Sequence, residues 1–263
     1  RLLKAPSNQR GRDFAIMLAA FNQLGYSVEW RVINAADYGR AQRRRRVFFF
    51  VFRNDTKWGK RLHTKYEATL SVDADIKTRL DCYAPYIFKD GLFGRQFPVK
   101  NEAVKKRINA NKLDEDIAEV SANFSDGKMW NSGLMTNGYY YTIETEPKGD
   151  EEPIPMKKIV VKENQVPEDY YIDGEKLEKF KYLRGPKKIT RTAANGHTYT
   201  FSEGGMSEYD SLELPGRTML TSEGSVNRST HLLKIDGKYR LITPIEAERL
   251  QDFPDDWTRY KRN

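Results

Sequence analysis

The chain has 263 residues, with 45 Lys or Arg against 37 Asp or Glu. Its net charge of +8 suits a polyanionic partner such as nucleic acid, but a merely solvated basic face explains the charge equally well. A single cysteine, Cys82, excludes an internal disulfide framework and a cysteine-based zinc site. The longest apolar run near the arginine cluster, 47–52, is far shorter than the ~20 residues of a membrane helix, and no signal peptide is recognisable, so we expect a soluble, intracellular protein of one or two domains.

The first 55 residues predict a helix, a strand, a turn and a second strand. Apolar residues recur at helical spacing from Phe14 to Leu24, and a glycine follows. Alternation over 26–32 predicts a strand with one buried face, and 34–39 predicts a turn. The apolar run 47–52 predicts a central strand covered by helices on both sides. This order fits the late part of a doubly wound sheet.

A run of arginines precedes the second strand. Because side chains alternate along an extended chain, Gln42, Arg44 and Arg46 project to one side and Arg43 and Arg45 to the other. Adjacent guanidiniums repel each other unless an acceptor-rich group lies against them. Phosphate and the oxygen edge of a base both qualify, since a guanidinium offers planar, bidentate donors to each.

The middle of the chain predicts a separate, β-rich and irregular domain. Gly, Pro and Tyr are scattered through it, 139–143 alternates as a strand does, and 105–120 is the best helical candidate. Within it, 182–202 carries four cations and no acid, interleaved with Tyr199 and Phe201. Such a stripe suits a surface that follows a nucleic-acid backbone. A pair of ordinary hairpin strands facing water explains it equally well.

The end of the chain predicts a short helix. Thr243 and Glu246 form a capping box with Pro244 at the first helical position, and the helix runs through Leu250 and stops before Pro254.

Three stretches together resemble the DNA (cytosine-5)-methyltransferase family. Residues 37–46 resemble its tyrosine-glycine followed by Gln-x-Arg-x-Arg, which enters a core strand. Residues 216–224 resemble the recognition-domain signature, a threonine followed by an aliphatic residue, and 240–254 resemble the later motif that closes that domain. The three occur in the family's order around a variable region.

The resemblance implies an α+β protein in three parts. Residues 1–55 would be the C-terminal part of the catalytic domain, an α/β remnant of a doubly wound methyltransferase sheet. Residues 56–235 would be a β-rich, irregular target-recognition domain that binds DNA, and 236–263 a closing helix motif that returns to the catalytic domain.

Some family features are altered or not found. Ala41, Ile245 and Asp252 stand where the family more often has proline, arginine and glycine. Cys82 lies between Asp81 and Tyr83, so it does not match the Pro-Cys context of the family's nucleophile. The Glu-Asn-Val motif and the Gly-rich loop for S-adenosylmethionine are not found, and the chain begins without methionine. We therefore expect a fragment that is inactive alone. Its expected partner is a missing N-terminal catalytic part, from the same gene or a separate subunit, and this missing part would bind most of the cofactor.

The resemblance also implies roles for individual residues. The family extrudes its target cytosine from the stack. Arg46 would contact O2 of the ring, Arg44 would contact O2 or the adjacent phosphate, and Gln42 would orient this pair, which stabilises negative charge in the transition state. The predicted contacts to double-stranded DNA are Arg184, Lys187, Lys188, Arg191, Arg217, Thr218, Met219, Asn227, Arg228 and Ser229. The predicted structural residues of the closing motif are Arg240, Thr243, Glu246 and Arg249.

Two other functions fit the residues. The chain could be a non-catalytic DNA-binding module that uses the arginine run as a basic patch, or a fragment of a tRNA cytosine-5 methyltransferase. The resemblance favours a restriction-modification enzyme from the cytoplasm of a bacterium or phage host, with a CG-containing site as its target. The three histidines, His63, His197 and His231, are interpreted as structural or DNA-facing and not as metal ligands.

Overall fold

The computed structural model describes residues 2–68, 70–100, 107–125 and 128–259. The chain forms two compact units. Unit 1 comprises Arg1–Ile33 and Arg45–Asp150, and unit 2 comprises Asn34–Arg44 and Glu151–Asn263. The division differs from the predicted domain boundaries, because residues of 56–150 pack on the strands that flank the arginine run and do not join 151–235.

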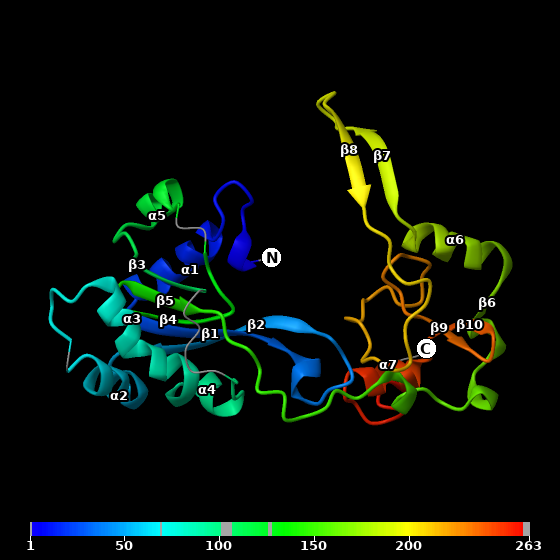
Figure 1. The fold of residues 1–263 in the computed structure, drawn as a ribbon, viewed down its shortest axis with the longest axis horizontal. Helices are drawn as coiled ribbons and strands as arrows, with labels where there is room; N and C mark the ends of the chain where they lie inside the picture. Colours follow the sequence, from blue (N-terminus) through cyan, green and yellow to red (C-terminus); the bar gives the residue numbers. More distant parts are fainter. Residues whose placement is uncertain (1, 69, 101–106, 126–127, 260–263) are drawn as a thin grey trace. The chain divides into compact units, whose positions relative to one another are not determined.

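Unit 1 is built on a five-stranded sheet in the order β2-β1-β4-β5-β3 (Figure 1). The strands are β1 (Tyr26–Asn34), β2 (Arg45–Arg53), β3 (Ile108–Lys112), β4 (Ser132–Thr136) and β5 (Tyr139–Ile143). The pairs β1–β4, β4–β5 and β3–β5 are antiparallel. Asn137 and Gly138 connect β4 to β5 with φ of 47° and 76°, as a two-residue hairpin turn requires.

Helices cover the sheet, and two apolar clusters form. The helices of unit 1 are η1 (Leu2–Lys4), α1 (Arg12–Gln23), α2 (Lys57–Tyr66), α3 (Ile76–Pro85), the π-helical turn η3 (Tyr86–Asp90), α4 (Leu92–Gln96) and α5 (Ile117–Asn123). Neighbouring strand residues point to opposite faces. Met135 and Tyr140 therefore join the cluster under α1, while Leu134 and Tyr141 join the cluster under α2 and α3.

Several predictions for this region need correction. The α+β class, the helix near Phe14 and the strand at 139–143 are confirmed. The prediction of a β-rich, irregular middle region is wrong where α2 and α3 form, since each of these helices has ten residues. The helix at 105–120 is also wrong: 108–112 forms strand β3 and the helix α5 begins only at Ile117, while 105 and 106 lie outside the described residues.

The two predicted strands exist, but their surroundings differ from the prediction. Strand β1 is buried on both faces, because η3 and α4 cover its polar side. Strand β2 lies at an edge of the sheet instead of its centre, with Phe48 48% exposed. Antiparallel pairing dominates the described strands, so a doubly wound arrangement stays a prediction.

The polar side chains of β1 belong to a buried hydrogen-bond network. The carboxylate of Glu29 accepts the amides of Leu92 and Phe93, each at 2.9 Å, where α4 begins. Arg31 donates to the carbonyls of Phe93 and Phe97 at 3.0 and 2.7 Å. Burial raises the pKa of Glu29, although the two amides and the nearby Arg31 charge work in the opposite direction. Gly91 is required beside it, since a Cβ there would lie 2.6 Å from a Glu29 carboxylate oxygen.

The described residues of unit 2 form a smaller sheet, a hairpin and two α-helices. The sheet order is β6-β10-β9, with antiparallel pairs, and β7 pairs with β8 in a separate antiparallel hairpin (Figure 1). The strands are β6 (Tyr171–Ile172), β7 (Lys187–Thr192), β8 (Thr198–Glu203), β9 (Leu232–Ile235) and β10 (Lys238–Leu241). The helices are η2 (Ala35–Tyr38), η4 (Met156–Lys158), η5 (Glu163–Gln165), η6 (Glu168–Tyr170), α6 (Gly174–Arg184) and α7 (Pro244–Leu250).

The predicted start of the last helix is confirmed. The Thr243 hydroxyl accepts the Glu246 amide at 3.3 Å, and the Glu246 carboxylate accepts the Thr243 amide at 2.7 Å, which completes the capping box of α7. In the described part of the chain, no helix combines the length and the apolar character that a membrane span needs.

The buried carboxylate of Glu29 gives a stability prediction. We expect Glu29→Ala to lower the free energy of unfolding by about 3–5 kcal/mol, because it leaves the Arg31 guanidinium without its neighbouring charge and two amides without an acceptor. Urea denaturation of the full chain measures the change. Glu119→Ala, which removes an exposed carboxylate on α5, should stay within about 0.5 kcal/mol of the unsubstituted protein. A loss below 1 kcal/mol for Glu29→Ala would contradict the assigned role.

Candidate nucleic-acid interface

A buried amide joins three distant segments of unit 2. Gln42 is 3% exposed. Its Nε2 donates to the Leu250 carbonyl at the end of α7, 3.1 Å away, and its Oε1 accepts the Met219 amide at 3.3 Å. The glutamine of the arginine run therefore contacts the recognition signature and the closing motif at once. No hydrogen bond from its side chain to Arg44 or Arg46 is found among the described residues, so Gln42 positions backbone segments.

The backbone on either side of Gln42 pairs with the recognition signature. Gln42 and Gly216 form a parallel bridge, in which the Gly216 amide donates to the Ala41 carbonyl and the Arg43 amide to the Gly216 carbonyl, both at 2.7 Å. The Thr218 hydroxyl donates to the Arg43 carbonyl at 2.8 Å. A Cβ on Gly216 would lie 2.6 Å from Leu250 Cδ1 and 2.9 Å from Met156 Sδ, so a larger residue would have to displace these two buried side chains.

The arginine side chains of the run are available for a ligand. Arg43 is exposed and Arg44 half-buried in unit 2, and neither forms a side-chain hydrogen bond or ion pair with another described residue. Arg45 and Arg46 are exposed and begin β2 in unit 1, where Arg46 Nη1 donates to the Arg45 carbonyl at 2.8 Å. These guanidiniums keep most of their donors for an external acceptor.

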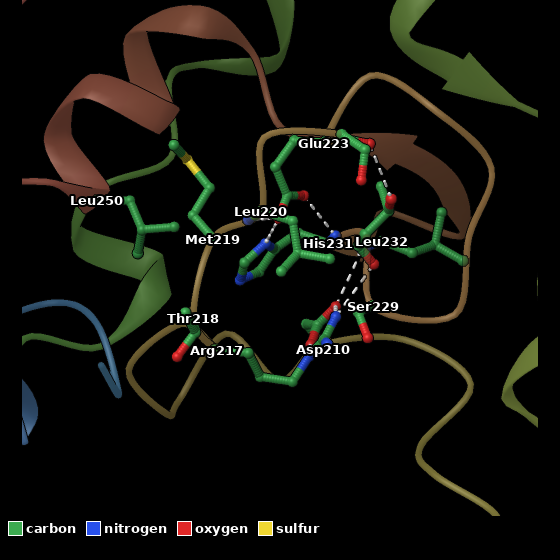
Figure 2. A network of polar contacts seen from close by, with 12 residues as sticks. Asp210, Arg217, Thr218, Met219, Leu220, Glu223, Ser229, His231, Leu232 and Leu250 are labelled. Carbon is green, nitrogen blue, oxygen red and sulfur yellow. Dashed lines mark hydrogen bonds and ion pairs between the residues drawn. The ribbon is translucent and has the colours of Figure 1, made fainter. Parts of the chain in front are cut away.

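A buried carboxylate holds two of the arginines predicted to bind DNA. Figure 2 shows Asp210 against the guanidinium of Arg217, whose Nε donates to Oδ1 at 2.5 Å. Arg184 Nη2 donates to Asp210 Oδ2 at 2.8 Å and to the Thr230 carbonyl at 2.6 Å. Burial would raise the pKa of Asp210, but hydrogen bonds and charge from Arg217 and Arg184 outweigh it and hold this pKa well below its usual range.

Burial corrects one predicted DNA contact. Arg184 is 1% exposed, and its two terminal nitrogens donate to protein acceptors, so it cannot reach a phosphate without dismantling this centre. Arg217 is 22% exposed and shares Asp210. Both arginines also donate to the Thr230 carbonyl, so they hold together the two ends of the recognition loop, defined here as residues 217–231.

A second carboxylate fixes the far side of the same loop. Glu223 accepts the amides of Leu220 at 2.9 Å and His231 at 2.8 Å, and His231 Nδ1 lies 3.1 Å from its Oε1 (Figure 2). Burial opposes ionisation here, but hydrogen bonds and charge from His231 outweigh it and lower the pKa of Glu223. His231 is fully buried, so of the two interpretations it is structural.

The remaining predicted residues of the loop are partly used within the protein. Asn227 Oδ1 accepts the amides of Ser229 and Thr230 at 2.9 and 3.0 Å, so it shapes the turn. Arg228 donates to the Leu183 carbonyl at 2.8 Å and pairs with Glu203 at 3.1 Å. The exposed residues here lie around the Ser222–Ser225 turn.

The predicted basic stripe forms the hairpin β7–β8. Lys187 is held by the Leu183 carbonyl at 2.7 Å and by Glu203 at 3.3 Å. Lys188 and Arg191 are exposed, and the Arg191 guanidinium lies 3.8 Å from the centroid of the Phe201 ring. Tyr199 is 43% exposed beside them. Cations and aromatic rings thus share an accessible hairpin, which keeps both interpretations of the stripe open.

The closing motif is held by ion pairs. Arg240 is fully buried and donates to Glu246 at 2.8 and 2.9 Å and to Glu163 at 2.9 Å. Arg249 donates to the Ile159 carbonyl at 3.0 Å and pairs with Asp255 at 2.7 Å. These contacts attach α7 to the η4 and η5 segments.

Sequence reasoning did not identify Asp210 or Glu223 as centres of this interface. Each is a single acid in a polar loop, and its arginine, histidine and amide partners lie up to 26 residues away. The basic stretch 182–202, which contains no acid, was interpreted as a surface for nucleic acid. It gave no sign that Arg184 pairs with an acid elsewhere in the chain.

The comparisons with known proteins define the class. A family model for C-5 cytosine-specific DNA methylases matches residues 3–263, so the chain belongs to that family. Members of the family use S-adenosylmethionine as the methyl donor to cytosine C5 in DNA. The resemblance found in the three motifs is confirmed.

Individual relatives are type II methyltransferases. M.Sau3AI of Staphylococcus aureus is 53% identical over 258 residues, which are 98% of this chain and 58% of that protein. M.MthTI of Methanothermobacter thermautotrophicus is 44% identical over 67 residues, 26% of this chain and 18% of the relative. M.HhaI of Haemophilus parahaemolyticus is 39% identical over 49 residues, which are 19% of this chain and 15% of that protein. The chain thus spans little more than half of M.Sau3AI.

The Asp210 centre gives a second stability prediction. We expect Asp210→Asn to lower the free energy of unfolding by about 3–5 kcal/mol near pH 7, because two arginines lose a buried counter-charge. Since folding lowers the pKa of Asp210, its contribution is complete above the ordinary aspartate pKa of about 3.9 and is lost as the pH falls below it.

Denaturation at a series of pH values checks this prediction. The difference between the unsubstituted chain and Asp210→Asn should shrink below about pH 4. Asp169→Asn, at an exposed position of the same unit, serves as the control and should change stability by less than about 0.5 kcal/mol. A difference that stays constant down to pH 2 would contradict the role of the ionised carboxylate.

Proposed function

We propose that this chain is the DNA-recognition half of a type II DNA (cytosine-5)-methyltransferase, which positions duplex DNA so that a target cytosine is flipped and methylated at C5. Family membership supports the class of reaction. The observation that carries the recognition role is the contact between the arginine run and the recognition signature. Thr218 and Arg43, 175 residues apart in sequence, meet through one hydrogen bond.

The proposal divides DNA contacts by their chemistry. Phosphate contacts fix the register of a protein on a duplex, whereas contacts to base edges select the sequence. Lys188 and Arg191 on the exposed hairpin are suited to phosphates, and Tyr199 adds an aromatic surface. Thr218 and Met219, anchored by Gln42 and Arg43, are suited to a position beside the target base.

The exposed arginines of the run are suited to the flipped base. Thiolate addition to C6 of cytosine places negative charge on the ring, and a guanidinium at O2 stabilises that charge more in the transition state than in the ground state. Arg46 at the start of β2 and Arg44 before it have donors free for this purpose.

We place the nucleophile outside this chain. Cys82 lies within α3, and its thiol donates to the Tyr66 carbonyl at 2.8 Å, which is not the setting of an activated thiolate. The exposed edge of β2, with Phe48 48% exposed, is a suitable docking position for the polypeptide that carries the nucleophile, from the same gene or a separate subunit.

The lining of the hollow on unit 1 does not fit S-adenosylmethionine. This hollow is bordered by Arg61, Lys65 and Arg95 with Asp90 as its one acid, and this excess of cations would repel the positively charged sulfonium. We therefore propose that the cofactor is held mainly by residues outside this chain.

A reconstitution experiment tests the proposal. Incubated with labelled S-adenosylmethionine and a cytosine-containing duplex, the chain alone should bind the duplex and leave it unmethylated. Addition of the part of M.Sau3AI that has no counterpart in this chain should produce label at cytosine C5. Methylation by the chain alone would refute our placement of the nucleophile. Failure to bind any duplex would refute the recognition role.

The reconstituted enzyme also tests Arg46. We expect Arg46→Ala to lower kcat by about 10²–10³-fold, because it removes a donor to developing charge, and to raise the Kd for DNA by less than about tenfold. Single-turnover methylation and equilibrium binding separate the two effects. Arg45→Ala, on the opposite side of the extended chain, is the matched control and should leave kcat nearly unchanged. Equal losses of kcat and affinity for Arg46→Ala would make it a phosphate anchor.

A further inference from the structure

Helix α2 of unit 1 carries a charge pattern that its own fold does not explain. Its ten residues include Lys57, Lys60, Arg61 and Lys65 and no acid. Like charges three or four positions apart on a helix repel each other, and Lys57 adds a cation near the positive end of the helix dipole. Lys65 is neutralised by an ion pair with Asp90, but the other three cations form no ion pair with a described carboxylate.

A hollow lies beside these cations. It has a volume of about 290 Å³ including its open mouth. It is formed by α2, η3 and α4 and is lined by Trp58, Arg61, Leu62, Lys65, Tyr66, Tyr86, Asp90 and Arg95. Arg61 and Arg95 are exposed, and neither has a carboxylate partner within 4 Å among the described residues. Three cations against one carboxylate leave the hollow with a net positive charge.

The floor of the hollow is fixed from beneath. Trp58 Nε1 donates to the Tyr86 hydroxyl at 2.9 Å, and that hydroxyl donates to the buried Glu29 at 3.2 Å. The Arg95 guanidinium lies 5.7 Å from the centroid of the Trp58 ring, which orients it above the floor. Arg95 therefore lies over an aromatic base that is tied to strand β1, and Arg61 lines the same hollow.

We propose that this hollow binds a backbone phosphate of duplex DNA, so that unit 1 carries a phosphate contact of its own in addition to those of unit 2. The inference rests on the proposed function. Two guanidiniums match the geometry of a phosphate, and such a contact carries no sequence information. The uncompensated Lys57 and Lys60 continue the positive ridge of α2 beyond the hollow, as a polymer of phosphates requires and a single free anion does not.

The salt dependence of DNA binding by the full chain tests the inference. A labelled duplex is titrated at several salt concentrations with the unsubstituted chain and with the double variant Arg61→Ala/Arg95→Ala. We expect the slope of log K against log salt to fall by about 1 or more, and the Kd near physiological salt to rise about tenfold. Duplexes of different sequence should show the same loss.

Two variants control for charge and for folding. Arg10→Ala/Lys77→Ala removes two exposed cations of unit 1 outside the hollow and should change Kd by less than about twofold. Arg61→Lys/Arg95→Lys keeps both charges and should retain most of the slope, and all variants should unfold at similar temperatures.

The outcomes separate this inference from the proposed function. If the hollow variant binds like the Arg10/Lys77 control, or if inorganic phosphate binds the hollow without any change in the DNA slope, the hollow is not a DNA contact. If the unsubstituted chain still binds duplex DNA through Lys188 and Arg191, the proposed function stands without this inference. Unsubstituted chain that binds no duplex would refute both.

Discussion

The recognition unit depends on one buried amide with both of its ends occupied. Gln42 donates to the carbonyl at the end of α7 and accepts the amide of Met219. A carboxylate could only accept and an ammonium could only donate, whereas the glutamine amide does both. Because the group is buried and hydrogen-bonded at both ends, it specifies one arrangement of three segments that are far apart in the sequence.

Buried carboxylates hold arginines within each of the two units. Asp210 holds Arg184 and Arg217, Glu246 holds Arg240, and Glu29 stands beside Arg31 on strand β1. In each case the arginine also donates to at least one main-chain carbonyl. A net charge of +8 therefore overstates how many cations face a ligand. The cations to which we assign a DNA contact lie in three places: the arginine run, the β7–β8 hairpin, and helix α2 with the hollow beside it.

Local pattern predicted what local forces decide. The helix near Phe14, the strand at 139–143 and the capping box at Thr243 need only nearby residues, and all three form. The burial of strand β1 was predicted wrongly. Alternation of polar and apolar residues normally indicates one solvent-exposed face, whereas here η3 and α4 bury Glu29 and Arg31. The middle region was misjudged because 56–150 extends the sheet of unit 1 through distant antiparallel pairs, which no short window of sequence contains.

The candidate site was predictable as a set of segments and not as a set of side chains. The three motifs were found separately, and the structure of unit 2 shows why they occur together: Gly216, Gln42 and Leu250 lie at one crossing, where a single added Cβ would collide with Leu250. Whether a given arginine serves the fold or the ligand is decided by acids such as Asp210, which the sequence does not mark. Arg184 and Arg191 have the same side chain and lie seven positions apart, yet one is buried in an ion pair and the other lies exposed over Phe201. Burial and counter-charge, more than residue type, therefore define which of the basic residues can meet DNA.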